Sequence, residues 1–292
     1  MPTPKQIYSH LDSTDQNYQR GSQKSWEQLW QEGNEVNYLS PESFVGINER
    51  IKVDSFIDKF LQAPGKRSLE CGCGLATVSM LLADRGFEVS MLDSSPEALR
   101  RVKITLETSR SRGTLLLGDI NAIPTPDSTY DLVHSYGVLE HFAEIEKPMK
   151  EMLRVLKPGG VFFADIVPAK QGFIHQIANI MNHTAIFAGS ILRLRLRKWW
   201  NFFNMERREK FYVNQHPLTD YLSVLKNHGL SNINSGGYGL FPDMAMPAFF
   251  KRKYYGYILR HRNWGIAFNN SGSAFSRQAG FGWWIYGVKP LK

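Results

Sequence analysis

The chain has 292 residues, of which 42% are hydrophobic and 13% aromatic, and its formal net charge is +8. This composition excludes an intrinsically disordered chain and is sufficient for one large domain or a core domain with elaborations. The first residues are polar and lack a signal-peptide core, and Cys71 and Cys73 are the only cysteines, so we expect a cytoplasmic protein. The most apolar window, residues 173–192, is interrupted by histidine, glutamine and asparagine, so no transmembrane helix is expected.

Hydrophobic periodicity and turn residues divide residues 49–167 into alternating helices and strands. The predicted elements are, in chain order, helix 49–61, strand 67–70, helix 77–85, strand 87–92, helix 95–109, strands 114–117 and 130–135, helix 144–156, a turn at 158–160 and strand 161–167. Such alternation is typical of a doubly wound, mostly parallel α/β sheet. Ligands of these sheets bind beyond the carboxyl ends of the strands.

The sequence LECGCGLAT, residues 69–77, lies where the first strand turns into the next helix. A nucleotide-like ligand would pass here against bare backbone, which explains the glycines Gly72 and Gly74. Cys71 and Cys73 occupy intervening positions, where small side chains fit. A zinc site normally needs more ligands and a wider spacing than Cys-X-Cys, and the sequence has no second cysteine pair, so no metal is expected.

Acidic residues follow three successive predicted strands. Glu70 ends the first strand, Asp93 ends the second and Asp119 follows the third. A carboxylate at Asp93 can accept hydrogen bonds from both hydroxyls of a ribose. Asp119 can accept one from an adenine amino group, and Glu70 can meet a cationic ligand. Together the three acids indicate a binding edge rather than three solvated loop residues.

Between about residues 65 and 168 the chain contains, in this order, LECGCG, VSMLDSSPEAL, LLGDINAIPTPDSTYDLVHSYGVLEHF and EMLRVLKPGGVFFADIV. In these segments and their spacing it resembles the class I S-adenosylmethionine-dependent methyltransferases of the small-molecule group. The resemblance implies a Rossmann-like methyltransferase fold with a seven-stranded sheet and S-adenosylmethionine as the cofactor. Residues 219–228 resemble the helix before the sixth strand of that fold, and residues 281–288 resemble its last, antiparallel strand.

The resemblance also implies which positions contact the cofactor. They are Glu70, Gly72, Cys73 and Gly74 at its methionine part, Asp93 and Ser94 at the ribose, Asp119 and Ile120 at the adenine, and Ser135 and Tyr136 after the fourth strand.

Two segments exceed the minimal fold, at about residues 170–212 and 243–278. We call them the cap segments, because in this fold both would emerge beside the cofactor and cover the substrate. Residues 1–48 would form a lid on the methyltransferase domain of residues 49–292. The aromatic residues assigned to the substrate are Trp26 and Trp30 in the lid and Trp199, Trp200 and Tyr254 in the cap segments.

The cap segments contain fourteen basic and three acidic residues, a net charge of +11, and they are rich in aromatic residues. Three interpretations compete: a solvated basic face over a packed interior, an interfacial element that contacts an anionic membrane peripherally, and a nucleic-acid surface whose aromatic residues stack on bases. Nucleic acid is not an expected partner, because no RNA-binding module is recognisable.

His141, in LEHF beyond the fourth strand, is the candidate catalytic base, and Tyr136 is the candidate for orienting the acceptor. Asp165 in the fifth strand would face the site or pack near it. We expect methyl transfer to a small hydrophobic or aromatic metabolite, as in secondary metabolism. The alternatives are methylation or cyclopropanation of a lipid or quinone-like membrane acceptor, methylation of tRNA or protein, and a cyclase that binds the cofactor without methylating. The acceptor atom and the oligomeric state stay open.

Overall fold

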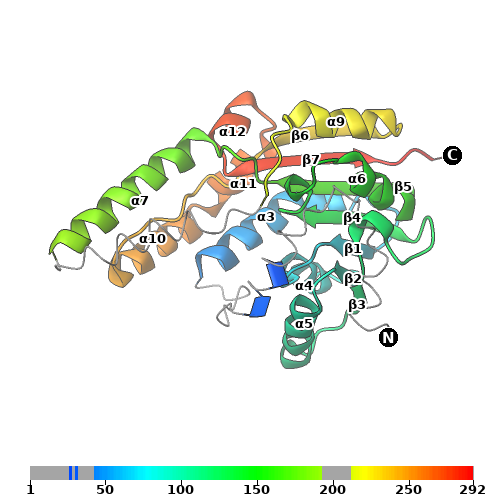
Figure 1. Ribbon diagram of the computed structural model, residues 1–292, viewed down its shortest axis with the longest axis horizontal. Coiled ribbons are helices and arrows are strands. Elements are labelled where there is room, and N and C mark those ends of the chain that lie inside the picture. The colour runs from blue at the N-terminus through cyan, green and yellow to red at the C-terminus, as the bar shows by residue number, and fades with distance from the viewer. Residues whose placement is uncertain (1–25, 28–29, 32–42, 193–211, 292) are drawn as a thin grey trace.

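A computed structural model describes residues 26–27, 30–31, 43–192 and 212–291 of the chain. The strands are β1 Arg67–Cys71, β2 Glu88–Asp93, β3 Thr114–Leu117, β4 Tyr130–Tyr136, β5 Leu156–Ile166, β6 Ser231–Tyr238 and β7 Gly282–Val288. They form one sheet in the order β3-β2-β1-β4-β5-β7-β6 (Figure 1). The pairs among β1 to β5 are parallel, and β7 is antiparallel to both β5 and β6. The predicted seven-stranded, mostly parallel sheet is confirmed.

Helices cover both faces of this sheet (Figure 1). The α-helices are α3 Phe44–Phe60, α4 Thr77–Ala83, α5 Pro96–Ser109, α6 Glu146–Val155, α7 Phe173–Leu192, α9 Leu218–Asn227, α10 Ala248–Arg260, α11 Arg262–Asn270 and α12 Ala274–Ala279, and two short 3₁₀ turns are η1 Ile120–Ala122 and η2 Leu139–His141. The side chains of α6 and α9 share one core cluster, and those of α3, α4 and α5 share another on the opposite face.

Strand β5 shows why the sheet is covered on both sides. Phe162 and Ala164 belong to the cluster under α6 and α9, whereas Val161 and Phe163 belong to the cluster under α3 and α4. Successive side chains of a strand point to opposite faces, so a continuously apolar strand requires helices on both.

The starts of two helices follow from capping side chains. Ser95 Oγ accepts a hydrogen bond from Ala98 N at 3.1 Å, and α5 begins at the next residue, Pro96. Ser43 Oγ accepts one from Gly46 N at 3.0 Å in the same way. Helix α3 therefore begins at Phe44, before the predicted start at residue 49, and the end of the predicted lid segment is part of this helix.

The predicted turn at residues 158–160 is a bulge inside β5. Tyr130 pairs with Leu156 and Leu132 pairs with Val161, so four residues of β5 stand opposite a single residue of β4. Gly159 has a φ of +76°, a conformation that glycine adopts without strain. The strand therefore starts earlier than predicted, because the turn residues interrupt its pairing without ending it.

Helices α7 and α10 lie in the two cap segments and project together from the sheet (Figure 1). Asn182 of α7 joins it to the loop before α10, since its Nδ2 donates to Asp243 O at 2.9 Å and its Oδ1 accepts from Ala245 N at 2.6 Å. Residues 193–211 of the first cap segment, including Trp199 and Trp200, lie outside the described residues. Within the described ranges, no helix has the length and apolarity to cross a membrane.

Gly237 provides a test of how α12 packs on β6. A Cβ at this position would lie 1.8 Å from the carbonyl oxygen of Ser276. We expect Gly237→Ala to lower the free energy of unfolding by about 3 kcal/mol, because the backbone of α12 must shift. Gly256→Ala in α10 is the control, since its Cβ would meet open space and alanine favours a helix by ~0.5–1 kcal/mol. Urea unfolding measures both, and a Gly237→Ala variant as stable as the natural protein would contradict this packing.

Candidate active site

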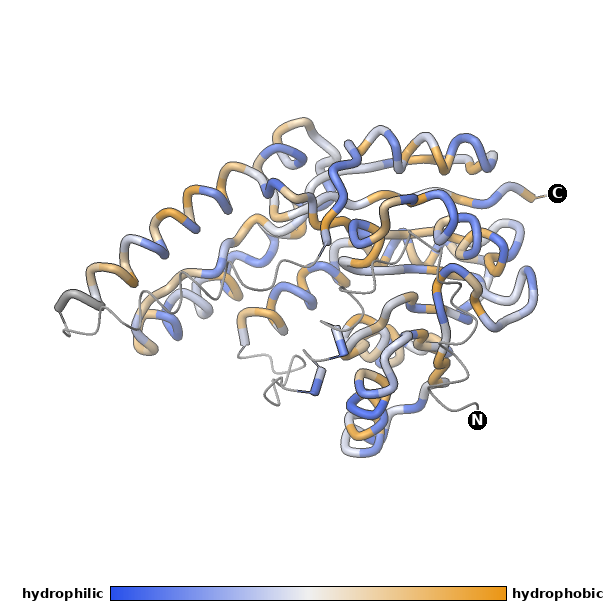
Figure 2. Tube along the Cα trace, in the orientation of Figure 1, coloured by the Kyte–Doolittle hydropathy of each residue, from blue (hydrophilic) through white to orange (hydrophobic). Residues whose placement is uncertain are grey.

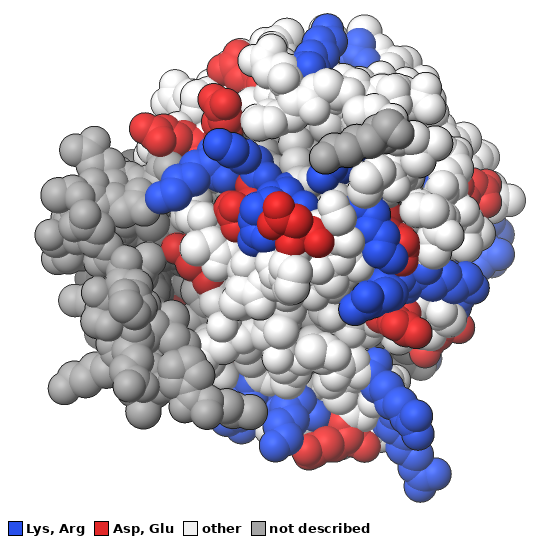
Figure 3. All heavy atoms as spheres, turned by 90° about the vertical axis from the view of Figure 1, so that its right-hand side faces the viewer, with Lys and Arg blue, Asp and Glu red and all other residues white. Residues whose placement is uncertain are grey.

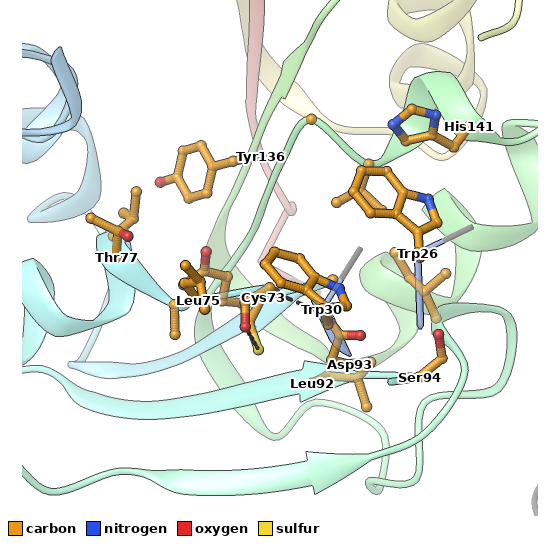
Figure 4. A pocket seen from close by; sticks show the side chains of 18 of the residues that line it. Trp26, Trp30, Cys73, Leu75, Thr77, Leu92, Asp93, Ser94, Tyr136 and His141 are labelled. Carbon is orange, nitrogen blue, oxygen red and sulfur yellow. Dashed lines mark hydrogen bonds between the residues drawn. The ribbon is translucent and has the colours of Figure 1, made fainter. Parts of the chain in front are cut away.

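A cavity of about 330 Å³ lies at the carboxyl ends of β1, β2 and β4, where the order of the strands reverses (Figure 4). The sequence-predicted residues that line it are Trp26, Trp30, Glu70, Gly72, Cys73, Gly74, Asp93, Ser94, Asp119, Ile120, Tyr136 and His141. Residues from four strand ends and from the N-terminal segment therefore meet at one site.

The glycine loop after β1 requires both of its glycines. Gly72 and Gly74 have φ angles of +69° and +52°, in the left-handed region that other residues adopt with strain. A Cβ at Gly72 would lie 2.6 Å from Val138 Cγ2, and one at Gly74 would lie 3.1 Å from the ring of Trp30. Because neither glycine has a side chain, the backbone of the loop can pack directly against Val138 and Trp30.

The two cysteines of this loop are buried free thiols. Burial raises the pKa of both Cys71 and Cys73, so each sulfur is protonated at neutral pH and a poor nucleophile. In the part of the chain that the structure describes, no three histidine, cysteine or acidic side chains gather where they could hold a metal ion.

Asp93 fixes the glycine loop to the end of β2. Its Oδ2 accepts from Gly74 N at 2.8 Å, and its Oδ1 accepts from Ser95 N at 2.9 Å. Burial raises the pKa of Asp93, and these backbone donors oppose the rise. A carboxylate has about four acceptor positions, so Asp93 retains capacity for donors in the cavity.

Glu70 is 3% exposed and accepts hydrogen bonds from Ser79 N at 3.0 Å and from Ser79 Oγ at 2.5 Å. Burial raises the pKa of Glu70 to about 8. The carboxyl group is therefore largely protonated at neutral pH, and a cation placed in the cavity would favour its ionised form.

Asp119 and Ile120 form the part of the cavity beyond β3. Asp119 Oδ1 accepts from Asn121 N at 2.8 Å and so caps the short turn η1. Ile120 is 6% exposed and belongs to the core cluster under α6, so its side chain forms a fixed apolar wall.

Two predicted site residues lie away from the cavity lining. Ser135 is fully buried, because alternate side chains of β4 point to opposite faces of the sheet and Tyr136 occupies the cavity side. Tyr254 donates its hydroxyl hydrogen to Pro242 O at 2.7 Å and packs against the cluster of Ile47 and Ile51. Neither Ser135 nor Tyr254 lines this cavity, so the structure does not bring them together with the other predicted site residues.

Glu49 is a cavity residue that the sequence analysis does not identify. Its carboxylate lies 3.0 Å from Lys52 Nζ, which lies 2.7 Å from Asp165 Oδ2 and 5.0 Å from the ring centre of Tyr136. Burial opposes the charge of Lys52, but Asp165 and Glu49 outweigh it and raise its pKa, so Lys52 stays a cation. In the sequence, Glu49 and Lys52 can be recognised as an acidic and a basic residue at positions i and i+3, on the face of α3 that carries Phe56.

Tyr136 lines the cavity with its ring, and its buried hydroxyl has no hydrogen-bond partner among the described residues. Burial raises the pKa of Tyr136, so the hydroxyl stays protonated and can donate. The ring lies toward Thr77 and away from His141 (Figure 4). The two predicted catalytic side chains therefore face different parts of the cavity.

His141 has a defined tautomer. Its Nδ1 lies 2.6 Å from the carbonyl oxygen of Tyr212, and because a carbonyl only accepts, Nδ1 carries the hydrogen and Nε2 the lone pair. Burial lowers the pKa of His141 below its ordinary value. The imidazole is therefore neutral at pH 7, which is the form that acts as a general base.

The N-terminal segment supplies one wall of the cavity. The ring of Trp26 packs edge-on against His141 with ring centres 5.2 Å apart, and Trp30 lies against Gly74 (Figure 4). Ser95 Oγ donates to Glu27 Oε2 at 2.5 Å, which ties this segment to the start of α5.

A second cavity of about 590 Å³ adjoins the first, and both are lined by Trp26, Gly137 and His141. Its other lining residues are Glu140, Val167, Pro168, Ala169, Lys170, Gln171, Gln176, Asn179 and Val213. Among the described residues of the cap segments, Lys170, Gln171, Gln176 and Asn179 line this second cavity, whereas α11 packs on α3 and α12 packs on β6. That both cap segments cover the substrate therefore stays a prediction, and the described residues that support it belong to the first cap segment.

Comparison with known proteins agrees with this geometry. Residues 69–164 match the family model described as a methyltransferase domain. The chain is 32% identical over 109 residues to a malonyl-[acyl-carrier protein] O-methyltransferase of Serratia marcescens, which covers 36% of this chain and 40% of the relative. It is 25% identical to a ubiquinone biosynthesis O-methyltransferase of Dechloromonas aromatica over 61% of this chain and 80% of the relative.

Residues 69–164 therefore carry a methyltransferase domain of the class I S-adenosylmethionine-dependent type. The chain spans less than half the length of the first curated relatives that it matches. A solved structure of an S-adenosylmethionine-dependent methyltransferase from Aquifex aeolicus shares the fold, with a TM-score of 0.50 and 11% identity over 90% of this chain and 98% of that chain.

S-adenosylmethionine is the cofactor of this methyltransferase domain, and the first cavity fits it chemically. The cofactor contains a sulfonium and an ammonium group, and the cavity is lined by the acidic side chains of Glu49, Glu70, Asp93 and Asp119. Ribose hydroxyls and an adenine amino group are donors, and Asp93 and Asp119 are acceptors at two adjacent strand ends.

The methyltransferase fold predicts that Asp93 is essential for cofactor affinity. Asp93→Ala should weaken binding of S-adenosylmethionine by roughly tenfold or more, because hydrogen bonds to a charged acceptor and the anchor of the glycine loop are lost. Isothermal titration calorimetry measures this effect. Asp58→Ala, at an exposed position of α3, is the matched control and should bind normally. Near-normal affinity of the Asp93→Ala variant would contradict the ribose assignment.

The raised pKa of Glu70 predicts that cofactor binding is linked to protons. Below about pH 8 the free protein holds this carboxyl protonated, and the cofactor's ammonium group favours the ionised form. Affinity should therefore rise between about pH 6 and 8, with release of up to one proton on binding. Calorimetry in buffers of different ionisation enthalpy detects the release, which Glu70→Gln should abolish. Undiminished release in that variant would assign the proton to another group.

Proposed function

We propose that this chain transfers the methyl group of S-adenosylmethionine to an oxygen atom of a small acceptor with an aromatic or otherwise apolar body. The observation that carries the proposal is the junction of the two cavities at Trp26, Gly137 and His141. A cofactor in the first cavity and an acceptor in the second would meet there, which is the proximity that methyl transfer requires.

The residues of the first cavity would bind and orient the cofactor, which supplies an electrophilic methyl group on its sulfonium when bound. We assign Glu70 and Glu49 to its ammonium group, Asp93 to the ribose and Asp119 with Ile120 to the adenine. Trp26 and Trp30 would exclude water from this side of the cavity, which strengthens the electrostatic contacts inside.

His141 would accept the proton of the acceptor hydroxyl through Nε2. The carbonyl of Tyr212 holds its Nδ1–H and so fixes the ring, with Nδ1 and that oxygen 2.6 Å apart. Because Tyr136 lines only the first cavity, we place it at the cofactor rather than at the acceptor, with its hydroxyl as a donor.

The lining of the second cavity indicates the chemistry of the acceptor. Val167, Pro168 and Ala169 give an apolar wall, and Lys170, Gln176 and Asn179 end in groups that hydrogen-bond oxygen. A phenol or quinol-like acceptor with an apolar ring and oxygen substituents matches both parts. The similar enzyme of Dechloromonas aromatica is named for ubiquinone biosynthesis, which supports an acceptor of this class.

A membrane-borne acceptor of the same chemistry is the second candidate. Helix α7 begins at the second cavity, and beyond Gln176 it exposes Ile177, Ile180 and Met181. An acceptor with a long apolar tail would find a continuous apolar path along this helix.

The role of His141 can be tested with a panel of catechols and hydroquinones, by measuring S-adenosylhomocysteine formation. His141→Gln should lower kcat by roughly 100-fold or more without changing the Kd of S-adenosylmethionine, because only the proton acceptor is removed. The natural protein should lose activity only below its lowered histidine pKa, and this acidic limb should vanish in the variant.

His228→Gln, at the end of α9, is the matched control and should leave both constants unchanged. Equal turnover by His141→Gln and the natural protein would remove the base assignment. Absence of S-adenosylhomocysteine formation with every acceptor, despite cofactor binding, would contradict the acceptor class.

A further inference from the structure

The outer face of α10 and α11 carries a row of aromatic and basic side chains. Phe249, Lys253, Tyr257, His261 and Trp264 recur every three or four residues and therefore share one face. Lys253 Nζ lies 4.5 Å from the ring centre of Phe249, and the rings of Tyr257 and His261 stack with centres 4.2 Å apart. We call these five residues the aromatic stripe.

The aromatic stripe is exposed although its helix is anchored firmly. Phe249 is 63% exposed and Trp264 is 55% exposed, values that are high for large apolar side chains. On the opposite side of α10, Ile258 is fully buried and Tyr255 packs on Phe44 of α3. The core contact of α10 is thus already made by its other face, and the stripe is not needed for folding.

Helix α7, the neighbour of α10, is also apolar on its exposed side. Ile177 and Ile180 are 53% and 64% exposed, and Met181 is 52% exposed. Figure 2 shows that apolar residues continue along α7 as it projects from the sheet. Aliphatic side chains of this kind cannot hydrogen-bond a nucleic acid, but they gain free energy in hydrocarbon.

The charge around the stripe has one sign. From residue 244 to the end of the sequence there is no acidic residue, and α10 carries Lys251, Arg252, Lys253 and Arg260. Asp243, just before α10, lies 3.9 Å from Lys251 Nζ, so the net charge around the stripe stays positive. The opposite end of the molecule is different, since basic and acidic side chains are interspersed there (Figure 3). A second copy of this positively charged surface would repel the first, whereas an anionic surface would attract it.

We infer that the aromatic stripe and its basic neighbours bind the surface of an anionic lipid bilayer. Tryptophan and tyrosine are favoured at the boundary of headgroups and acyl chains, and lysine and arginine attract anionic headgroups. The contact is peripheral. It would bring α7, and with it the second cavity, close to the membrane. The inference stands independently of the proposed methyl transfer and would deepen it by supplying a route for an apolar acceptor.

Flotation with vesicles tests this surface in the full-length protein. Vesicles of phosphatidylcholine with about one third phosphatidylglycerol should bind the protein at least about tenfold more tightly than phosphatidylcholine alone, and roughly 0.5 M salt should weaken the binding. The double variant Lys253→Glu/Trp264→Ser should lose about tenfold in affinity for the anionic vesicles.

The matched control is Lys103→Glu/Ile104→Ser on α5, another exposed basic–apolar pair on a different face of the molecule, which should bind vesicles normally. Equal losses in both double variants, or no binding by the natural protein, would overturn the inference. Binding of single-stranded RNA in place of vesicles, with the same sensitivity to the stripe variant, would overturn it in favour of a nucleic-acid surface. Calorimetry with S-adenosylmethionine on the same preparations reports separately on the cofactor site, so a failure of either proposal is distinguishable.

Discussion

The geometry of the site depends on one buried carboxylate, Asp165 in β5. Its Oδ1 accepts a hydrogen bond from Gly137 N at 2.7 Å, and its Oδ2 lies 2.7 Å from Lys52 Nζ. The side chain thus joins β5, the loop after β4 and helix α3 at one point. Because Asp165 is 1% exposed, leaving either charge unpaired would cost several kcal/mol, so these three elements are held together. The wall with His141 and the wall with Glu49 are fixed relative to each other by this contact.

The net charge of the chain conceals two opposite distributions. Acidic side chains converge on the first cavity, which we assign to the cationic cofactor, and burial raises the pKa values of Glu70 and Asp93. Basic side chains gather on α10 at the far side of the fold, where they are solvated. Buried carboxylates interact with a charge inside the cavity, where screening is weak, whereas an exposed basic face acts on its surroundings within about a Debye length.

In the second cap segment, the spacing of aromatic residues does not show which of their side chains are buried. Aromatic residues stand on both sides of α10, and the sequence offers no means to tell which side is packed. The contacts with Ile47 and Ile51 on α3 decide it, since they bury the side of Tyr254 and leave the side of Tyr257 exposed. Tyr254, which the sequence analysis assigned to the substrate, is therefore part of a structural cluster. The exposed residues on the other side of α10 form the aromatic stripe.

The sequence by itself determined the alternation of strands and helices, the glycine loop and the acids at successive strand ends. These depend on local periodicity, on backbone conformations that only glycine adopts easily, and on the rule that parallel strands end at one edge. Only the tertiary structure decided that Glu49 faces the cavity, that Ser135 does not, and that a second cavity meets the first at His141. The physical reason is that these features arise from contacts between α3, β4, α7 and the N-terminal segment, which are far apart along the chain and leave no periodic signal in it.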